Sequence, residues 1–348
     1  MIIKTLKKNL PHKKIDNDHY GQFLGSFNFL RILSWNIFHP NRIINRLLWN
    51  TFFVFLSSKI KKFSKEIKNK DLLNKFIFFI KNGGVVIENY FSEEKIDNFL
   101  NEYKGLIEEE KKKIINDNQN ISQYHAMYLP LSQALIDLWL EDNMVKFIES
   151  YSGNKIFARE YPRLIYTKYL ADDELTSKNS YAGKYSNKKV NGPYFWHVDH
   201  AAGHLNLHIL LHDTSVEDSH MQFLPESNQY FNSRDLFSNE VVSKFKNKPI
   251  DCVGKKGTVY FHQGNTLHKV VGKKYSERLN LIFSFSKGAR IEMNCEIIAK
   301  AFSGDFDINK LSKEKRNILK GIFPLNGSND LINKNLVKPK FSEDSSVN

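Results

Sequence analysis

The stretch FWHVDHAAGHLNLHILLHD, residues 195–213, decides the fold class of this chain. In its second half apolar and polar residues alternate, which predicts a strand with one face against an apolar core. The apolar face carries Leu205, Leu207, Ile209 and Leu211. The polar face carries His204, Asn206, His208 and His212. On a helix, His200 would join three of these in a histidine ladder with four-residue spacing, but the Leu/Ile alternation favours the strand.

The segments on either side of this stretch repeat the pattern of short strands separated by turns. They are RLIYTKYL (163–170), MQFLP (221–225), GTVYFHQ (257–263) and RLNLIFSF (278–285). In the last of them, one face carries Arg278, Asn280, Ile282 and Ser284. Strands this short and closely spaced predict an antiparallel barrel or jelly roll whose inner face is polar and whose outer face packs against helices.

The residues before position 157 predict helices that flank the β structure. Asp71 is expected to cap an amphipathic helix, and residues 85–87 are expected to form a short strand. Ser92 is expected to cap a second helix, and a further helix is expected over residues 130–151. The fold class is therefore mainly β with flanking α.

This pattern divides the chain into three parts. Residues 71–300 are expected to form the barrel domain with its supporting helices. Residues 1–70 are expected to form a basic, aromatic-rich extension of helical character, and residues 301–348 a polar tail. Within the barrel domain, the polar stretch 171–192 is long for a loop and is a candidate lid.

The positive charge of the chain is concentrated in the extension. The whole chain of 348 residues carries a formal charge of +13. Residues 1–70 hold 14 Lys and Arg against three acids, which is +11, so the other residues carry only +2. Nucleic-acid binding needs a basic surface on the folded domain, and this distribution argues against it. With two cysteines, the chain is also neither a disulfide scaffold nor a cysteine-based zinc module.

The extension allows two interpretations. The uncharged run LLWNTFFVFLSS, residues 47–58, is too short to span a bilayer, but its flanking cations suit a membrane interface. It could equally form helices that pack on the main domain. Because no secretory signal and no long apolar run is visible, we expect a cytoplasmic protein, with peripheral membrane contact through residues 1–70 as an option.

The candidate chemistry lies in three residues of two strands. His197 and Asp199 are two residues apart, so on a strand their side chains share a face. His268 follows the strand GTVYFHQ and its turn. Two histidines and one carboxylate form the facial triad of non-haem Fe(II) oxygenases, which leaves three coordination positions open. His197, Asp199 and His268 are therefore the expected metal ligands.

A fourth residue, Arg278, follows His268 by ten residues and suggests a 2-oxo acid cosubstrate. A bidentate 2-oxo acid would fill two open positions and O₂ the third. The charges then balance, because Fe²⁺ with Asp199 gives +1, 2-oxoglutarate brings −2, and Arg278 restores neutrality. The planar guanidinium of Arg278 is suited to bind the distal carboxylate.

Further residues are expected to line the cosubstrate site. Asn280 shares a face with Arg278, and Asn206 and His208 lie on the polar face of the neighbouring strand. Tyr166 and Lys168 share one face of the strand 163–170 and could bind the 2-oxo acid or the substrate.

The segment from about residue 76 to 286 resembles the phytanoyl-CoA dioxygenase family. The resemblance rests on NGGVVIENYFSEEKIDNFLNEY (82–103), WHVDH (196–200), FLPESN (223–228) and KKGTVYFHQGNTLH (255–268), followed by an arginine. It implies a double-stranded β-helix that uses Fe(II), 2-oxoglutarate and O₂. The implied products are a hydroxylated small molecule, succinate and CO₂.

The chain departs from the family pattern at four positions. Glu226 and Asn228 stand where the family has Gly and His, and His220 stands where a Gly normally precedes the next strand. Asn280 replaces a Ser or Thr. None of these is an expected metal ligand. Asp199 also points to hydroxylation, because related halogenases have a small residue there.

Two other hypotheses compete with the hydroxylase. The first is a cupin-type metal enzyme that uses no 2-oxo acid, which would make Arg278 dispensable. The second is a non-catalytic protein that binds a membrane surface or a partner through residues 1–70. The sequence leaves the substrate and the oligomeric state open.

Overall fold

The computed structural model describes the middle of the chain with several gaps. The described residues are 65, 67–115, 122–152, 157–169, 196–199, 204–229, 236–237, 242, 245–273, 276–286, 300–301, 303–319 and 322. The uncharged run 47–58 and the candidate lid 171–192 lie outside them. Among the described helices, none combines the length and apolarity that crossing a bilayer requires.

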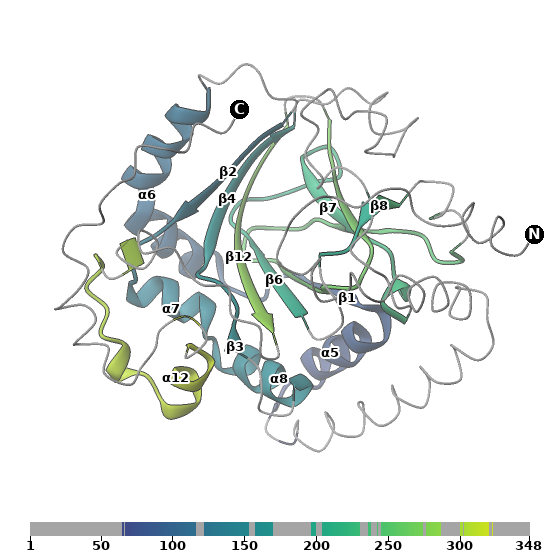
Figure 1. The fold of residues 1–348 in the computed structure, drawn as a ribbon, viewed down its shortest axis with the longest axis horizontal. Coiled ribbons are helices and arrows are strands. Elements are labelled where there is room, and N and C mark those ends of the chain that lie inside the picture. The colour runs from purple at the N-terminus through teal and green to yellow at the C-terminus, as the bar shows by residue number, and fades with distance from the viewer. Residues whose placement is uncertain are drawn as a thin grey trace, which may run out of the picture.

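A seven-stranded antiparallel sheet forms the centre of the fold (Figure 1). Its strand order is β1–β10–β6–β12–β4–β2, and β3 pairs with the end of β12. The strands are β1 (Gly84–Ile87), β2 (Ser122–Tyr128), β3 (Phe157–Ala158), β4 (Arg163–Tyr169), β6 (His204–Leu210), β10 (Val259–Gln263) and β12 (Glu277–Ser286). Neighbouring strands are often far apart in the chain, so the sheet joins the N-terminal and C-terminal halves of the described chain.

Helices cover one face of this sheet. They are α5 (Lys70–Asn82), α6 (Glu93–Ile115), α7 (Gln133–Trp139), α8 (Asp142–Ser152) and α12 (Lys313–Leu319). Their apolar side chains form one core with the outward face of the sheet, in which Phe76 stacks on Phe147 with ring centroids 3.9 Å apart. Figure 1 shows α5, α6, α7 and α8 on the same side of the large sheet.

A smaller sheet packs against the other face. Its order is β8–β5–β11–β7–β9, formed by β5 (Trp196–His197), β7 (His220–Phe223), β8 (Leu236–Phe237), β9 (Ile250–Cys252) and β11 (His268–Val271). Leu210 and Tyr260 of the large sheet pack with Met221, Phe223 and Cys252 of the small one. Two facing antiparallel sheets with helices outside form the expected double-stranded β-helix.

Strand alternation separates the two faces of the large sheet as the sequence predicts. In β6, Leu205, Leu207 and Ile209 belong to the helix-covered core. In β12 the same holds for Leu279, Leu281, Phe283 and Phe285. The intervening polar residues are also buried, including Asn206, His208, Arg278 and Asn280. They lie between the two sheets, and β6 is a strand, so the histidine ladder does not form.

Several local features differ from the expectations. Asn69 caps α5 by accepting from the backbone N–H groups of Asp71 and Leu72, so Asp71 lies in the first turn. The helix expected over 130–151 is two helices, because the chain breaks at Leu140 and Glu141 caps α8 through its side chain. Strand β2 has no counterpart in the sequence prediction.

The segment expected to be a separate tail contributes to the main core. Ile308, Ile318, Leu319 and Ile322 are buried in the same cluster as the helices and the large sheet. At least the described part of residues 301–322 therefore packs on the barrel domain.

Gly83 is required by the way α5 approaches the barrel. Its φ of 78° ends the helix in the left-handed region, and its N–H donates to the Phe79 carbonyl. A Cβ at this position would lie 2.4 Å from Thr266 Oγ1. Gly83 thus lets the end of α5 touch the turn that precedes His268.

Candidate metal centre

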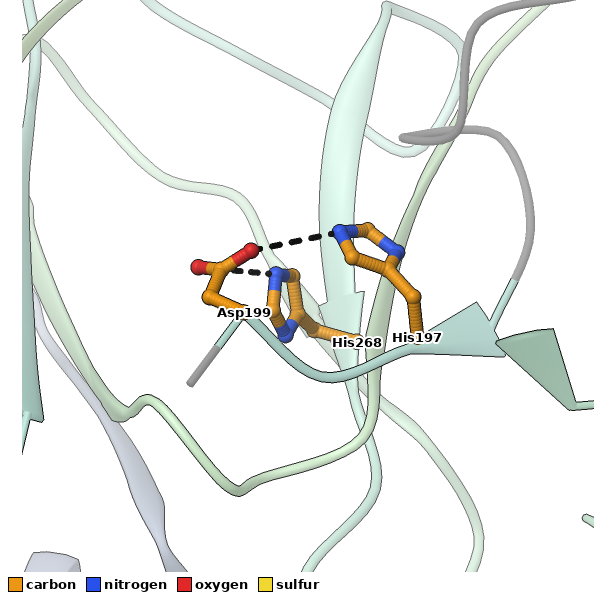
Figure 2. A group of neighbouring side chains, drawn as sticks. All are labelled: His197, Asp199 and His268. Atoms are coloured by element: carbon orange, nitrogen blue, oxygen red, sulfur yellow. Dashed lines mark ion pairs between the residues drawn. The ribbon is translucent and has the colours of Figure 1, made fainter. Parts of the chain in front are cut away.

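His197, Asp199 and His268 bring one ligand atom each into a single group, within 4.8 Å of one another. Asp199 Oδ1 lies 3.5 Å from His197 Nε2, and Asp199 Oδ2 lies 3.4 Å from His268 Nε2. Figure 2 shows the three side chains pointing toward one another. The three residues expected from the sequence to bind metal are therefore neighbours in space.

Backbone pairing places these ligands. His197 and His268 are directly opposite each other in the antiparallel pair β5–β11. The backbone N–H of Asp199 donates to the Gly264 carbonyl, in the turn before His268. His268 Nδ1 donates to the Thr266 carbonyl over 2.9 Å, which leaves Nε2 as the lone-pair nitrogen facing Asp199.

The electrostatics of the group keep the carboxylate of Asp199 ionised. Burial by itself would raise the pKa of Asp199, but His268 and His197 hold it well below its ordinary value. Burial likewise lowers the pKa of His268, and the attraction of Asp199 more than offsets it, so the pKa is raised. The carboxylate is therefore ionised, which is the form that binds metal.

Arg278 lies on the inner face of β12 and is 4% exposed. Its Nε has no hydrogen-bond partner within the described residues, and neither has Asn280 Oδ1, His208 Nδ1 or Thr167 Oγ1. Thr167 is directly opposite Arg278 in the β4–β12 pair. Because buried polar groups are normally paired, this concentration of unpaired atoms marks a place for a polar ligand.

The sequence comparison matches the same region. The family model described as phytanoyl-CoA dioxygenase (PhyH) matches residues 79–270, which is 192 of the 348 residues. The chain belongs to the phytanoyl-CoA dioxygenase family. The matched segment contains all three candidate ligands and ends before Arg278, whose place is therefore shown by the structure alone. No curated protein matches the chain.

The chain is also similar to several solved structures, at low sequence identity. EctD from S. alaskensis, in its apoform, is 16% identical with a TM-score of 0.46, over 70% of this chain and 84% of that chain. The epimerase SnoN, in complex with Fe3+, alpha ketoglutarate and nogalamycin RO, is 12% identical with a TM-score of 0.43, over 70% and 93%. The alpha ketoglutarate dependent carbocyclase SnoK is 19% identical with a TM-score of 0.42, over 64% and 85%.

The cofactors of the phytanoyl-CoA dioxygenase family are Fe(II), 2-oxoglutarate and O₂. The donor atoms present fit this iron, since two imidazole nitrogens and one carboxylate form the facial ligand set of non-haem Fe(II). The unpaired guanidinium of Arg278 fits the distal carboxylate of the 2-oxo acid. Iron, when bound, would supply open positions for the 2-oxo acid and O₂. The chain is thus an Fe(II)/2-oxoglutarate oxygenase in its general class.

The structure corrects one of the expected site residues, Tyr166. Tyr166 lies on the helix-covered face of β4, where it is buried in the outer core and Lys111 Nζ of α6 lies 5.0 Å from its ring centre. It cannot contact a ligand between the sheets. The side chain of Lys168 lies outside the described residues, so its expected role stays a prediction.

Thr167 is the inner-face residue that sequence reasoning missed. Arg278 lies on the inner face of β12, and residues directly opposite in an antiparallel pair share a face. Its partner Thr167 therefore lies on the inner face of β4. That register cannot be derived from the sequence. Apolar and aromatic residues occur on both faces of RLIYTKYL, so its pattern does not indicate which face points inward.

The other expected cosubstrate residues lie in the interior with different contacts. His208 stacks on Tyr260 with ring centres 4.5 Å apart and shares a hydrogen bond of 3.3 Å with His262. Asn280 Nδ2 donates to Tyr260 Oη over 2.7 Å. Asn206 is already bonded to protein groups through both ends of its amide.

The remaining departures from the family pattern have structural roles. His220 contacts Asp251 over 2.9 Å on the β7–β9 pair. Asn228 donates to the Ile80 carbonyl and Gln263, and so links α5 to the turn before His268. Glu226 has a φ of 64°, the left-handed region in which glycine is favoured.

Proposed function

We propose that this protein hydroxylates a small organic substrate while it decarboxylates 2-oxoglutarate to succinate and CO₂, with His197, Asp199 and His268 holding Fe(II). The observation that carries the proposal is the spatial group of two imidazoles and one carboxylate, in a chain of the phytanoyl-CoA dioxygenase family. A carboxylate in the triad leaves no ligand position for a halide, which favours hydroxylation over halogenation.

Each protein group has a stated task in this proposal. The histidine nitrogens and Asp199 hold the metal, and Arg278 binds the distal carboxylate of 2-oxoglutarate. Thr167 is opposite Arg278 and has an unpaired buried hydroxyl, so it donates to the same carboxylate. His208 and Asn280 supply the other unpaired polar atoms of the interior.

The test is a turnover assay on the purified full chain. Protein loaded with Fe(II) is incubated with 2-oxoglutarate and O₂ in the presence of pooled small metabolites. We expect succinate to form and one substrate to gain the mass of a single oxygen atom. Loss of hydrogen without gain of oxygen would replace hydroxylation by desaturation or ring closure. Iron binding without any 2-oxoglutarate binding would favour the cupin-type enzyme instead.

We also propose that residues 1–70 hold this enzyme at an anionic membrane surface. The proposal is supported by the net charge of +11 in this segment and by its aromatic-rich apolar run. Sedimentation with anionic and with neutral vesicles tests it. The full chain should bind anionic but not neutral vesicles, and added salt should weaken this binding. Unchanged binding after deletion of residues 1–64 would contradict the proposed role.

A further inference from the structure

A continuous line of buried hydrogen bonds leads from Arg159 to the metal-site carboxylate. Arg159 Nη1 lies 3.1 Å from His204 Nδ1. His204 Nε2 lies 2.8 Å from Asn206 Oδ1. Asn206 Nδ2 lies 2.8 Å from Asp199 Oδ2. Arg159, His204 and Asn206 are each at most 6% exposed, so these bonds form away from water, where they are stronger.

The direction of every bond in this line follows from its first member. A guanidinium can only donate, so His204 Nδ1 must accept. His204 then carries its proton on Nε2 and donates to Asn206. Asn206 must accept this hydrogen bond through Oδ1, because its amide nitrogen can only donate. The hydroxyl of Ser284 also donates to Oδ1, over 2.7 Å. The amide nitrogen of Asn206 is therefore left to face Asp199.

Reversal of this amide would be unfavourable at both ends. Asn206 would then present its oxygen to the ionised Asp199 and its NH₂ group to the donating Nε2–H of His204. Arg159 is itself fixed on β12, because its backbone N–H donates to the Ser284 carbonyl over 2.8 Å. The line thus ties the end of β12 to the loop that carries Asp199.

We infer that Asn206 is a positioning residue for Asp199, and that Arg159 and His204 act through it by fixing which way its amide points. The bond from Asn206 occupies Oδ2, so it restricts rotation of the carboxylate and directs Oδ1, which faces His197 Nε2, to bind the cation in a one-oxygen mode. Asn206 therefore binds the carboxylate of Asp199 and does not bind the cosubstrate. The inference rests on the proposed role of Asp199 as a metal ligand.

The first test needs no substitution in Asn206. Nitrogen-15 NMR of the metal-free protein, with His204 identified by loss of its signal in His204→Gln, reports which ring nitrogen carries the proton. We expect Nε2 to be protonated and Nδ1 to be bare. The opposite tautomer, or a doubly protonated ring, would overturn the inference, because the amide would then not be fixed.

The second test measures Co(II) affinity and the visible Co(II) spectrum of the full chain. Asn206→Leu should weaken Co(II) binding by about 10–100-fold, the range for partners that orient metal ligands. His204→Leu should weaken Co(II) binding less than Asn206→Leu does. His204→Gln should restore the wild-type affinity, because the glutamine amide can donate to Asn206 Oδ1. Asn82→Leu is the matched control, because among the described residues the Asn82 side chain bonds only the Phe78 carbonyl of its own helix.

The outcomes separate the inference from the proposed function. If the wild-type chain binds no Co(II), the metal site itself is refuted. If the wild type binds Co(II) and a folded Asn206→Leu binds it equally well with an unchanged spectrum, the positioning role is refuted. Should Asn206→Leu not fold, the contrast between His204→Leu and His204→Gln decides, because equal affinities in that pair would overturn the inference.

Discussion

His197 and His268 are direct partners across the antiparallel strands β5 and β11, and their rings lie 4.2 Å apart between centres. A single cross-strand pair of the small sheet thus brings together two candidate ligands that lie far apart in the chain. Asp199 joins them from the extended segment that follows β5. The candidate metal site therefore depends on the register of one short strand pair, and a slip of one residue would move one imidazole to the opposite face.

The first prediction concerns the ligand set. His268→Ala should lower Co(II) affinity by more than about 100-fold, because a ligand contributes more than the groups that orient it. Competition with a chromophoric chelator measures this. His212→Gln is the control, since His212 Nε2 accepts from the Leu279 N–H outside the site. A loss as large in His212→Gln would point to the rejected histidine ladder.

The second prediction compares adjacent residues on opposite faces of β4. Thr167→Val should weaken anaerobic 2-oxoglutarate binding by about 5-fold, the value of one hydrogen bond near 1 kcal/mol. Tyr166→Phe should leave that binding unchanged, because Tyr166 faces α6. Calorimetry on the metal-loaded protein gives both dissociation constants. An effect confined to Tyr166→Phe would show that the assignment of the inner face is reversed.

The third prediction concerns Arg278 itself. Arg278→Gln should raise the dissociation constant for 2-oxoglutarate by about 10–100-fold, since hydrogen bonds to charged groups contribute about 1.5–3 kcal/mol. Co(II) affinity in the absence of 2-oxoglutarate should be retained, because Arg278 is not a metal ligand. Unchanged 2-oxoglutarate binding would support an enzyme that does not use this cosubstrate.

The fourth prediction is a pH dependence of stability. Burial, followed by the charges of His262 and Arg278, holds the pKa of His208 well below its ordinary value. The folded protein keeps His208 neutral, whereas the unfolded chain binds a proton below about pH 6.5. The unfolded chain is therefore stabilised by proton binding as the pH falls below about 6.5. The free energy of unfolding should decrease for this reason by about 1.4 kcal/mol between about pH 7.5 and about pH 5.5.

Urea unfolding with chelator present tests this contribution. His208→Gln should lose about 1.4 kcal/mol less than the wild type over the same interval of pH. Equal losses in the two proteins would show that His208 does not remain neutral in the folded state.

The fifth prediction separates core from surface on one helix. Phe76→Ala should lower the free energy of unfolding by about 3–5 kcal/mol, because Phe76 is fully buried against Phe147 and Phe261. Phe78→Ala on the same helix should change it by less than about 0.5 kcal/mol, because Phe78 is 43% exposed. Comparable losses would mean that the outer side of α5 is covered by another part of the chain.

The amino-acid sequence by itself determined the class of fold and which three residues form the candidate metal site. Alternation in β6 and β12 has a period of two, so the inner and outer faces follow directly from which residues are apolar. The spacing of His197 and Asp199 places both on one face for the same reason. Helix ends were less well predicted, as at Asn69 and Leu140, because local capping side chains and packing decide them.

Only the tertiary structure decided which interior residues lie beside which. The face of β4 that looks inward depends on its register with β12, so Thr167 and not Tyr166 lies opposite Arg278. The contacts of Asn206 depend on Arg159, His204 and Ser284, which come from three separate segments. Alternation along a strand is a local property, but register and hydrogen-bond direction arise from pairing between distant segments, and that information exists only in the folded chain.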